Sequence, residues 1–167
     1  MPSDIIVVRG APGSGKSSVA RHLGRQLPTG ATIEVDTIRG MIHHIQWECD
    51  DLHIDAIHAT VSAAIAYLER GYRPVVLVDT FGFGRLELAL AALGPRTVSV
   101  HSLTCHNLML SLRLWTRLVG YRNASAARRF NAHIAADQAH HAGVLDTTWR
   151  HSAAVARRIL LQGGWIS

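Results

Sequence analysis

The sequence predicts an α/β fold in which helices cover both sides of a buried parallel sheet. Two observations carry this prediction: short apolar runs rich in β-branched residues alternate with segments of helical spacing, and two of those runs end at an aspartate. The 167 residues contain no internal repeat, low-complexity segment or linker, so we expect one domain over residues 1–167. Such sheets bind ligands at the carboxyl ends of their strands, where the search for a functional site begins.

Five apolar runs are the expected strands. The run Pro-Val-Val-Leu-Val has the most strand-like composition, and Asp79 follows it, as Asp36 follows the second run. The expected strands are residues 5–8, 31–35, 74–78, 97–103 and 144–145.

The segments between the strands have the apolar spacing of helices. Gly71 ends the longest helix, which is rich in alanine, and Gly94-Pro95 ends the next one. Residues 120–125 are expected to form a mobile loop. The expected helices are residues 17–27, 37–47, 51–70, 86–93, 106–119, 126–141 and 152–161.

Charge and cysteine content exclude several classes of protein. The formal charge of +5 favours anionic ligands but is too small, without a basic run, to indicate a nucleic-acid coat. Cys49 and Cys105 form no CxxC pair, and there is no HExxH segment, so neither a disulfide framework nor a zinc site is expected. Without a signal-peptide pattern or a long apolar span, we expect no membrane partner and a reducing, cytoplasmic location.

Residues 10–17 carry the strongest motif, G-x-x-x-x-G-K-[ST], between the first strand and the first helix. Its glycines let backbone N–H groups point at phosphate oxygens, and the helix adds its N-terminal dipole. Lys16 reaches the β- and γ-phosphates, and the Ser17 hydroxyl binds Mg²⁺. We therefore expect nucleotide contacts from Gly10, Ala11, Pro12, Gly13, Ser14, Gly15, Lys16, Ser17 and Ser18.

Two missing features narrow the class of this P-loop protein. Lys16 is the only lysine, so the Asn-Lys-x-Asp segment of guanine-specific GTPases cannot exist. Thr80 follows Asp79, where many motor and chaperone ATPases place a glutamate that activates water. Transfer of a phosphoryl group to a hydroxyl acceptor is therefore favoured over hydrolysis.

Two aspartates at strand ends are the candidate groups for such a transfer. Asp36 is expected to face the γ-phosphate and to accept the proton of the acceptor; the alternative is an N-cap for the next helix. Asp79 holds the metal through water or holds the acceptor; its alternative is also a cap.

Three arginines are candidates for a lid over the phosphates, at about residues 113–130. Arg113 and Arg117 are four residues apart and share one helix face, and Arg122 follows in a loop. Guanidinium groups there would stabilise the transferring phosphoryl group and exclude water. We expect Arg113 and Arg117 to be catalytic. We expect Arg117 and Arg122 to contact the nucleotide. The alternative is a solvated basic face.

These motifs resemble the small P-loop kinase family that includes polynucleotide 5′-kinase, chloramphenicol phosphotransferase, the zeta toxins and related AAA-type predicted kinases. Residues 36–39 resemble its D-x-x-R segment, and residues 78–80 with Arg85 resemble the third-strand segment of polynucleotide kinases. The lid arginines and residues 144–148 also resemble segments of that family. The resemblance implies a three-layer αβα sandwich with five parallel strands in the order 2-3-1-4-5. It also implies that Asp36 is the general base and that Arg39 helps to hold the acceptor.

The remaining candidates lie around the acceptor. The expected acceptor-binding residues are Asp36, Arg39, Asp79, Thr80, Phe81 and Arg85. His43, His44, Met41, Trp47 and Phe83 are further candidates to line or stack on the acceptor, with surface exposure or core packing as the alternative.

Three functions remain open from the sequence. The first is an ATP- and Mg²⁺-dependent kinase for a hydroxyl of a small molecule of antibiotic, sugar or nucleoside type. The second is a polynucleotide 5′-hydroxyl kinase, and the third is a nucleotide-gated switch without an acceptor. The sequence indicates neither the acceptor, nor the preference for ATP over GTP, nor the oligomeric state.

Overall fold

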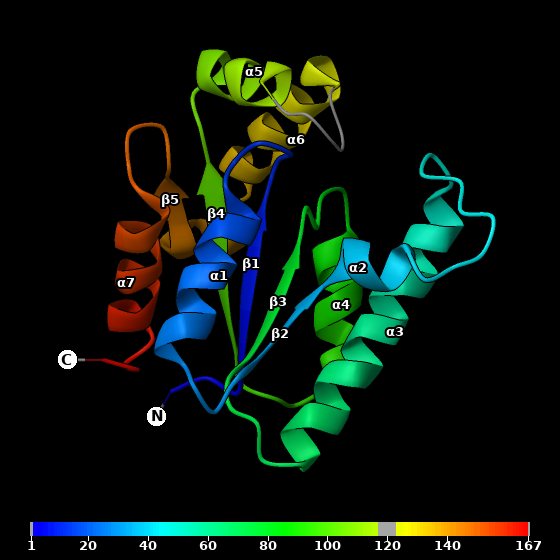
Figure 1. The fold of residues 1–167 in the computed structure, drawn as a ribbon, viewed down its shortest axis with the longest axis vertical. Helices are drawn as coiled ribbons and strands as arrows, with labels where there is room; N and C mark the ends of the chain where they lie inside the picture. The colour runs from blue at the N-terminus through cyan, green and yellow to red at the C-terminus, as the bar shows by residue number, and fades with distance from the viewer. Residues whose placement is uncertain (1, 117–122, 167) are drawn as a thin grey trace.

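The computed structural model describes residues 2–116 and 123–166. A central sheet lies between helices, and further helices lie over the carboxyl ends of the strands (Figure 1). In chain order the elements are β1 (Ile5–Gly10), α1 (Lys16–Gln26), β2 (Ala31–Glu34), α2 (Val35–Arg39), α3 (Asp50–Glu69), β3 (Val75–Asp79), α4 (Arg85–Leu93), β4 (Val98–Thr104), α5 (Asn107–Trp115), α6 (Ala124–Ala136), the 3-10 helix η1 (Gln138–Gly143), β5 (Val144–Asp146) and α7 (Ser152–Gln162).

The five strands form one parallel sheet in the order β2-β3-β1-β4-β5. This confirms the expected fold class and strand order. β1 is central and buried along its whole length. Because the strands are parallel, the P-loop after β1 and the polar residues after β2 and β3 meet at one edge of the sheet.

The two faces of the sheet pack against different helices, because successive side chains of a strand point to opposite sides. Ile5 and Val7 of β1 pack in a core with residues of α3 and α4. Ile6 and Val8 pack in a second core with residues of α1 and α7. In Figure 1, α1 and α7 lie on one side of the sheet and α3 and α4 on the other, which gives the three layers.

Several predicted boundaries were wrong, and the largest errors lie near the site. The second strand ends at Glu34, and α2 covers only five residues because turns replace the predicted helix from residue 40 to residue 47. The predicted helix 126–141 is divided at Asp137, whose Oδ1 accepts a hydrogen bond from the Ala139 amide at 3.1 Å where η1 begins. Helix α6 begins at Ala124, inside the segment expected as a loop.

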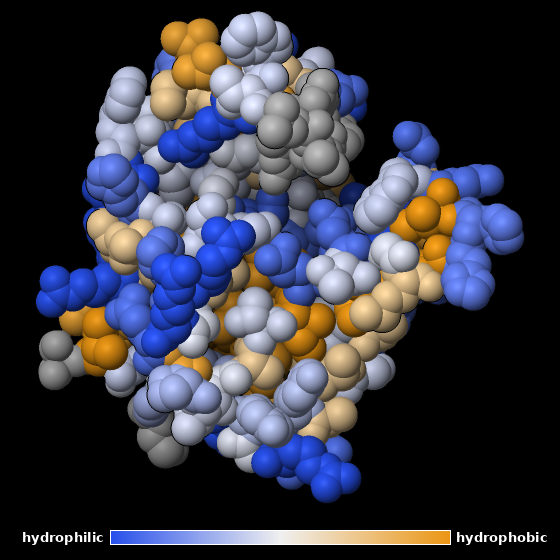
Figure 2. Space-filling model, in the orientation of Figure 1, coloured by the Kyte–Doolittle hydropathy of each residue, from blue (hydrophilic) through white to orange (hydrophobic). Residues whose placement is uncertain are grey.

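The helices α5 and α6 lie above the carboxyl ends of the strands, where the lid was expected (Figure 1). Below them this face of the molecule is hollowed and lined mostly by hydrophilic residues (Figure 2). None of the helices in residues 2–116 and 123–166 has both the length and the apolar character needed to cross a membrane.

Candidate active site

Three glycines shape the loop between β1 and α1. Gly13 and Gly15 have φ angles of +87° and +95°, a conformation that residues with a side chain rarely adopt. At Gly10, a Cβ atom would come within 2.7 Å of the Leu103 carbonyl oxygen in β4. The loop therefore needs glycine where the motif has it. It leads into the N-terminus of α1, whose N–H groups attract anions.

The first two residues of α1 face the loop and the end of β2. Lys16 Nζ donates a hydrogen bond to the Ala11 carbonyl oxygen at 3.2 Å, and Ser17 Oγ donates one to Glu34 Oε2 at 3.0 Å. Sequence reasoning did not indicate Glu34, because it lay inside the predicted strand 31–35, whereas the observed strand ends at Glu34. The signal that marks it is a single acidic residue in the short strand Ala-Thr-Ile-Glu.

Asp36 lies in the first turn of α2 and not at the end of a strand. Its side chain is exposed, yet crowding by protein atoms and the nearby Asp79 carboxylate raise its pKa. Lys16, His53 and Arg39 oppose this rise. The structure thus brings Asp36 within electrostatic reach of the P-loop lysine and of Asp79. Its predicted role as general base stays a prediction.

Asp79, the last residue of β3, is buried and paired with a histidine. Its Oδ2 lies 2.9 Å from His53 Nε2 and accepts a hydrogen bond from the Phe81 amide at 3.2 Å. Burial acts to raise the pKa of Asp79, but the hydrogen bond and charge of His53, with Lys16, outweigh it and lower the pKa. Asp79 is therefore held as a carboxylate. His53 comes from α3, far along the chain, so no local pattern marks it.

Arg39 binds the protein through its guanidinium group. Its Nη2 donates to the carbonyl oxygens of Trp47 at 2.8 Å, Cys49 at 2.9 Å and Gln46 at 3.4 Å. The guanidinium also lies over the Trp47 ring, 5.1 Å from its centroid. These contacts fix the turns between α2 and α3. The predicted contact of Arg39 with the acceptor is not visible in this geometry and stays a prediction.

The segment after Asp79 differs from the acceptor-binding segment that the sequence predicts. The Phe81 side chain is 1% exposed and packs in the core beside α3 and α4, so its ring does not line the cleft. Thr80 is partly exposed at the strand end. Arg85 Nη2 donates to Asp50 Oδ1 at 2.5 Å, which ties the start of α4 to the start of α3.

Loop 81–84 also contacts α6. The Phe83 ring stacks on His133 with 4.4 Å between centroids, and the Phe83 amide donates to His133 Nε2 at 3.0 Å. A Cβ atom at Gly82 would come within 2.6 Å of the Phe130 ring. The strand end next to Asp79 and the helix expected as lid are therefore in direct contact.

Arg113, the first predicted lid arginine, joins three segments. Its guanidinium donates to the carbonyl oxygens of Thr147 at 2.9 Å and of Gly13 and Thr148 at 3.3 Å. It thus connects α5, the P-loop and the segment after β5. The other two arginines, Arg117 and Arg122, lie outside the described residues, and their roles remain predictions.

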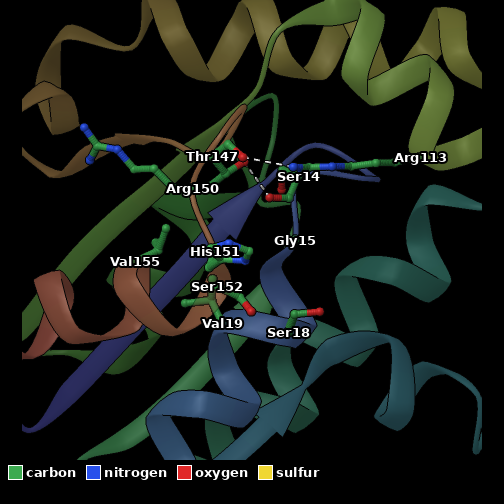
Figure 3. Close-up of a pocket in the computed structure, with 10 residues that line it drawn as sticks. All are labelled: Ser14, Gly15, Ser18, Val19, Arg113, Thr147, Arg150, His151, Ser152 and Val155. Atoms are coloured by element: carbon green, nitrogen blue, oxygen red, sulfur yellow. Dashed lines mark hydrogen bonds between the residues drawn. The ribbon is translucent and has the colours of Figure 1, made fainter.

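Two adjoining cavities open at the P-loop. The smaller, of about 190 Å³, is lined by Gly13, Gly15, Lys16, Ser17, Ser18 and Arg113. The larger, of about 270 Å³, lies between the P-loop and the β5–α7 segment (Figure 3) and is lined by Ser14, Gly15, Ser18, Val19, Arg113, Thr147, Arg150, His151, Ser152 and Val155.

Hydrogen bonds join the two segments that line the larger cavity. Thr147 Oγ1 donates to the Ser14 carbonyl oxygen at 2.9 Å, so this threonine and Arg113 fix the P-loop against the β5–α7 segment (Figure 3). Sequence reasoning missed residues 150–152 as part of the site, because they follow a strand of only three residues and form no recognised pattern.

A second polar cluster joins β1 to η1. Arg9 is buried in β1, donates to Ser102 Oγ at 2.7 Å and forms an ion pair with Asp137. Burial opposes ionisation of Asp137, but Arg9 and His140 lower its pKa to about 2. Together with Glu87, the Asp137 and His140 side chains form a group of metal-ligand type. Because Arg9 already neutralises Asp137, we interpret this cluster as a structural connection between β1 and η1.

One protein family matches the sequence: an AAA domain, over residues 5–97, more than half of the chain. The chain belongs to this AAA-domain family. The matched part of the AAA domain contains the P-loop, Glu34, Asp36, His53 and Asp79, and it ends before β4. No curated protein sequence matches the chain.

Solved structures share the fold of this AAA-domain protein over nearly its whole length. A tunicamycin resistance protein from Deinococcus radiodurans has 18% identity and a TM-score of 0.76, with 97% of this chain and 96% of that one covered. A sugar kinase from a Janibacter species has 20% identity, a TM-score of 0.72 and coverages of 96% and 94%. An APS kinase from Mycobacterium tuberculosis, in complex with AMPPNP and APS, has 16% identity, a TM-score of 0.74 and coverages of 99%.

Proposed function

We propose that the chain is an ATP-dependent kinase that transfers the γ-phosphoryl group to a hydroxyl of a small molecule. The observation that carries the proposal is Asp36, a carboxylate with a raised pKa within electrostatic reach of Lys16. Such a group can take the proton of an attacking hydroxyl as general base. The similarity in fold to a sugar kinase and an APS kinase supports this reaction class.

The two cavities support the placement of ATP. The smaller one, at the N-terminus of α1, suits the phosphates, and Lys16 would contact the β- and γ-phosphates there. The larger one suits the nucleoside, because it adjoins the first and is partly apolar at Val19 and Val155. Arg113 lines both cavities. We also propose that Arg117 and Arg122 cover the transferring phosphoryl group.

The oxygen atoms around Ser17 fit a magnesium ion, which prefers oxygen ligands. The Ser17 hydroxyl lies 3.0 Å from a Glu34 carboxylate oxygen, and Asp79 ends the neighbouring strand. Ser17, Glu34 and Asp79 would hold the ion. When bound, Mg²⁺ neutralises charge on the phosphates. A cytoplasmic location, where ATP is available, is part of the same proposal.

Transfer of label tests the proposal. The protein is incubated with γ-labelled ATP and a library of antibiotics, sugars, nucleosides and a 5′-hydroxyl oligonucleotide, and phosphorylated products are sought by mass spectrometry. We expect transfer to a small molecule that Lys16→Ala abolishes. Labelling of the oligonucleotide alone would instead identify a polynucleotide kinase. ATP turnover that no acceptor changes, and that Asp36→Asn leaves unchanged, would favour a nucleotide-gated switch.

Asp36→Asn tests the general base. We expect kcat to fall about 10²- to 10⁴-fold because the asparagine amide cannot accept the proton, while the Kd for ATP changes little. Asp55→Asn, an exposed position on α3, is the matched control. In the parent enzyme, kcat/KM should fall as the pH drops through the raised pKa of Asp36, at a higher pH than an ordinary aspartate would give. The opposite pattern, weaker ATP binding at unchanged kcat, would assign Asp36 a structural role.

A further inference from the structure

The helices α1 and α7 form one outer layer of the molecule, and its charged side chains have one sign. The two helices lie on the same side of the sheet (Figure 1), where Leu23 of α1 and Ile159 of α7 belong to one core. The segments that contain them, residues 5–33 and 147–166, have no aspartate and no glutamate. The carboxylates of the chain therefore belong to other elements.

Four arginines lie on the exposed side of this layer. Arg21 and Arg25 are about one turn apart on α1. Arg157 and Arg158 are neighbours on α7, and because successive helix residues differ by about 100°, they lie on the two flanks of its exposed side. All four are exposed, and none has a hydrogen bond or an ion pair to another described residue. We call this surface the arginine face; Figure 2 shows strongly hydrophilic side chains gathered over α1.

The net charge of +5 conceals this face. On the other side of the sheet, α3 contains Asp50, Asp51, Asp55 and Glu69 and neither arginine nor lysine, so the two layers partly cancel in the total. The sequence also shows no basic run, because the four arginines come from helices near opposite ends of the chain. A surface of one sign attracts polyanions whatever the total charge, and only the fold reveals it.

An exposed aromatic ring lies at the end of this layer where α7 begins. Trp149 and Arg150 belong to the segment between β5 and α7, and both are exposed. Trp149 is 83% exposed, and its ring has no aromatic contact with another described residue. The nearby acid is Asp146, whose carboxylate interacts with Arg150. Proteins that bind single strands combine such rings, on which bases stack, with basic residues that bind the phosphates.

The chemistry of the arginine face favours nucleic acid over a membrane or an acidic protein. A helix that lies on a bilayer has large apolar side chains beside its basic ones. In α1 and α7, which the structure describes completely, Leu161 is the only large apolar side chain that is exposed. A guanidinium group can bind phosphate through two parallel hydrogen bonds, and the Trp149 ring offers a stacking surface that a base can use and a carboxylate cannot.

We propose that the arginine face binds single-stranded nucleic acid. The guanidinium groups of the face pair with phosphates, and the Trp149 ring stacks on a base. This surface covers the outer side of α1 and α7, away from the acceptor side at the ends of β2 and β3. The inference goes beyond the proposed kinase function and does not depend on it.

Titration with a labelled single-stranded oligonucleotide that already carries a 5′-phosphate tests the proposal, because its 5′ end cannot accept a phosphoryl group. With four arginine–phosphate contacts, log K should fall with log salt concentration with a slope of about −3. The double variants Arg21→Gln/Arg25→Gln and Arg157→Gln/Arg158→Gln should each lower the affinity at least about tenfold. Each should also make the slope less steep by about 1.4.

Two controls separate this surface from charge in general and from the P-loop. Arg70→Gln/Arg73→Gln removes two exposed arginines beyond the end of α3 and should leave affinity and slope unchanged. Lys16→Ala should lose ATP binding and keep oligonucleotide binding. Equal affinity in the parent and both arginine-face variants would overturn the proposal. Tighter binding to phosphatidylserine vesicles or to polyglutamate than to the oligonucleotide would also overturn it.

Trp149→Ala tests the stacking contact. We expect it to lower the affinity for the single strand about fivefold or more, to change the affinity for a duplex little, and to leave the salt slope unchanged. Trp115→Ala, at an equally bare position of α5 with 81% exposure, is the matched control. The same affinity for the single strand in both variants would overturn the role given to Trp149.

Discussion

Glu34 brings a carboxylate to the hydroxyl that the motif assigns to the metal. Glu34 Oε2 accepts a hydrogen bond from Ser17 Oγ at 3.0 Å, which leaves a lone pair of that hydroxyl oxygen available for a cation. Residues that orient a metal ligand in this way commonly change metal affinity when they are replaced.

We therefore expect Glu34→Gln to raise the Mg²⁺ concentration needed for tight binding of a non-hydrolysable ATP analogue about tenfold. The amide keeps the size of the side chain but loses its charge. Calorimetric titrations at several Mg²⁺ concentrations measure this. Glu48→Gln, at an exposed site before α3, is the control. An unchanged Mg²⁺ requirement in Glu34→Gln would remove Glu34 from the metal site.

Motif residues could be predicted from the sequence, whereas their partners could not. Lys16, Ser17 and Asp36 stand in patterns whose chemistry is local, so residue order is enough to find them. His53 reaches Asp79 from a different element, and Asp50 reaches Arg85 across 35 residues of sequence. Such pairs depend on how α3 packs on the sheet, which no local pattern encodes.

At the scale of elements, α5 contributes Arg113 to both cavities at the P-loop. Arg113 near its C-terminus is bonded to the P-loop on one side and to the segment after β5 on the other. The relative position of these two loops depends on that one guanidinium together with Thr147.

Arg113→Ala should accordingly weaken ATP binding. The loss of three charge-assisted hydrogen bonds leaves carbonyl oxygens unpaired and lets the cavities widen, so we expect Kd for an ATP analogue to rise about 10- to 100-fold. Arg128→Ala, on the exposed side of α6, removes only a bond to Ser111 and should change Kd less than about twofold. Equal affinities of the two variants would show that Arg113 does not shape the site.

Element types were easier to predict than element ends. The strands β1 and β3 are apolar almost throughout and buried along their whole length, so composition alone identifies them. The helix expected at residues 37–47 ends at Arg39, because the Arg39 side chain binds carbonyl groups of the following segment and holds that segment in turns. Asp137 likewise divides α6 from η1 through its bonds to Arg9 and the Ala139 amide.

At the scale of the whole molecule, a buried histidine links stability to pH. His101 in β4 is 5% exposed, neither ring nitrogen has a hydrogen-bond partner among the described residues, and burial lowers its pKa from 6.5 to about 4. Between pH 6.5 and pH 4, His101 therefore binds a proton in the unfolded chain but not in the folded chain. Stability from this residue is complete above pH 6.5 and is lost as the pH falls toward 4.

We expect the free energy of unfolding to fall by about 3 kcal/mol between pH 7 and pH 4 through His101 alone. In His101→Met, which has similar volume and no titratable group, this component should disappear, and stability at pH 7 should be equal or higher because no polar atom is left unpaired. Urea denaturation at both pH values measures it. An identical pH dependence in the variant and the parent would contradict the assignment.

Under the proposed kinase function, the contact between loop 81–84 and α6 is a physical connection between the end of β3 and the helices above the P-loop. Phe83 stacks on His133, and Gly82 leaves no space before the Phe130 ring, so a displacement of that loop must be transmitted to α6. If an acceptor bound at the end of β3 changes the affinity for ATP by some factor, ATP must change the affinity for the acceptor by the same factor. The Phe83–His133 stack is the contact through which such a mutual effect would pass from the end of β3 to α6.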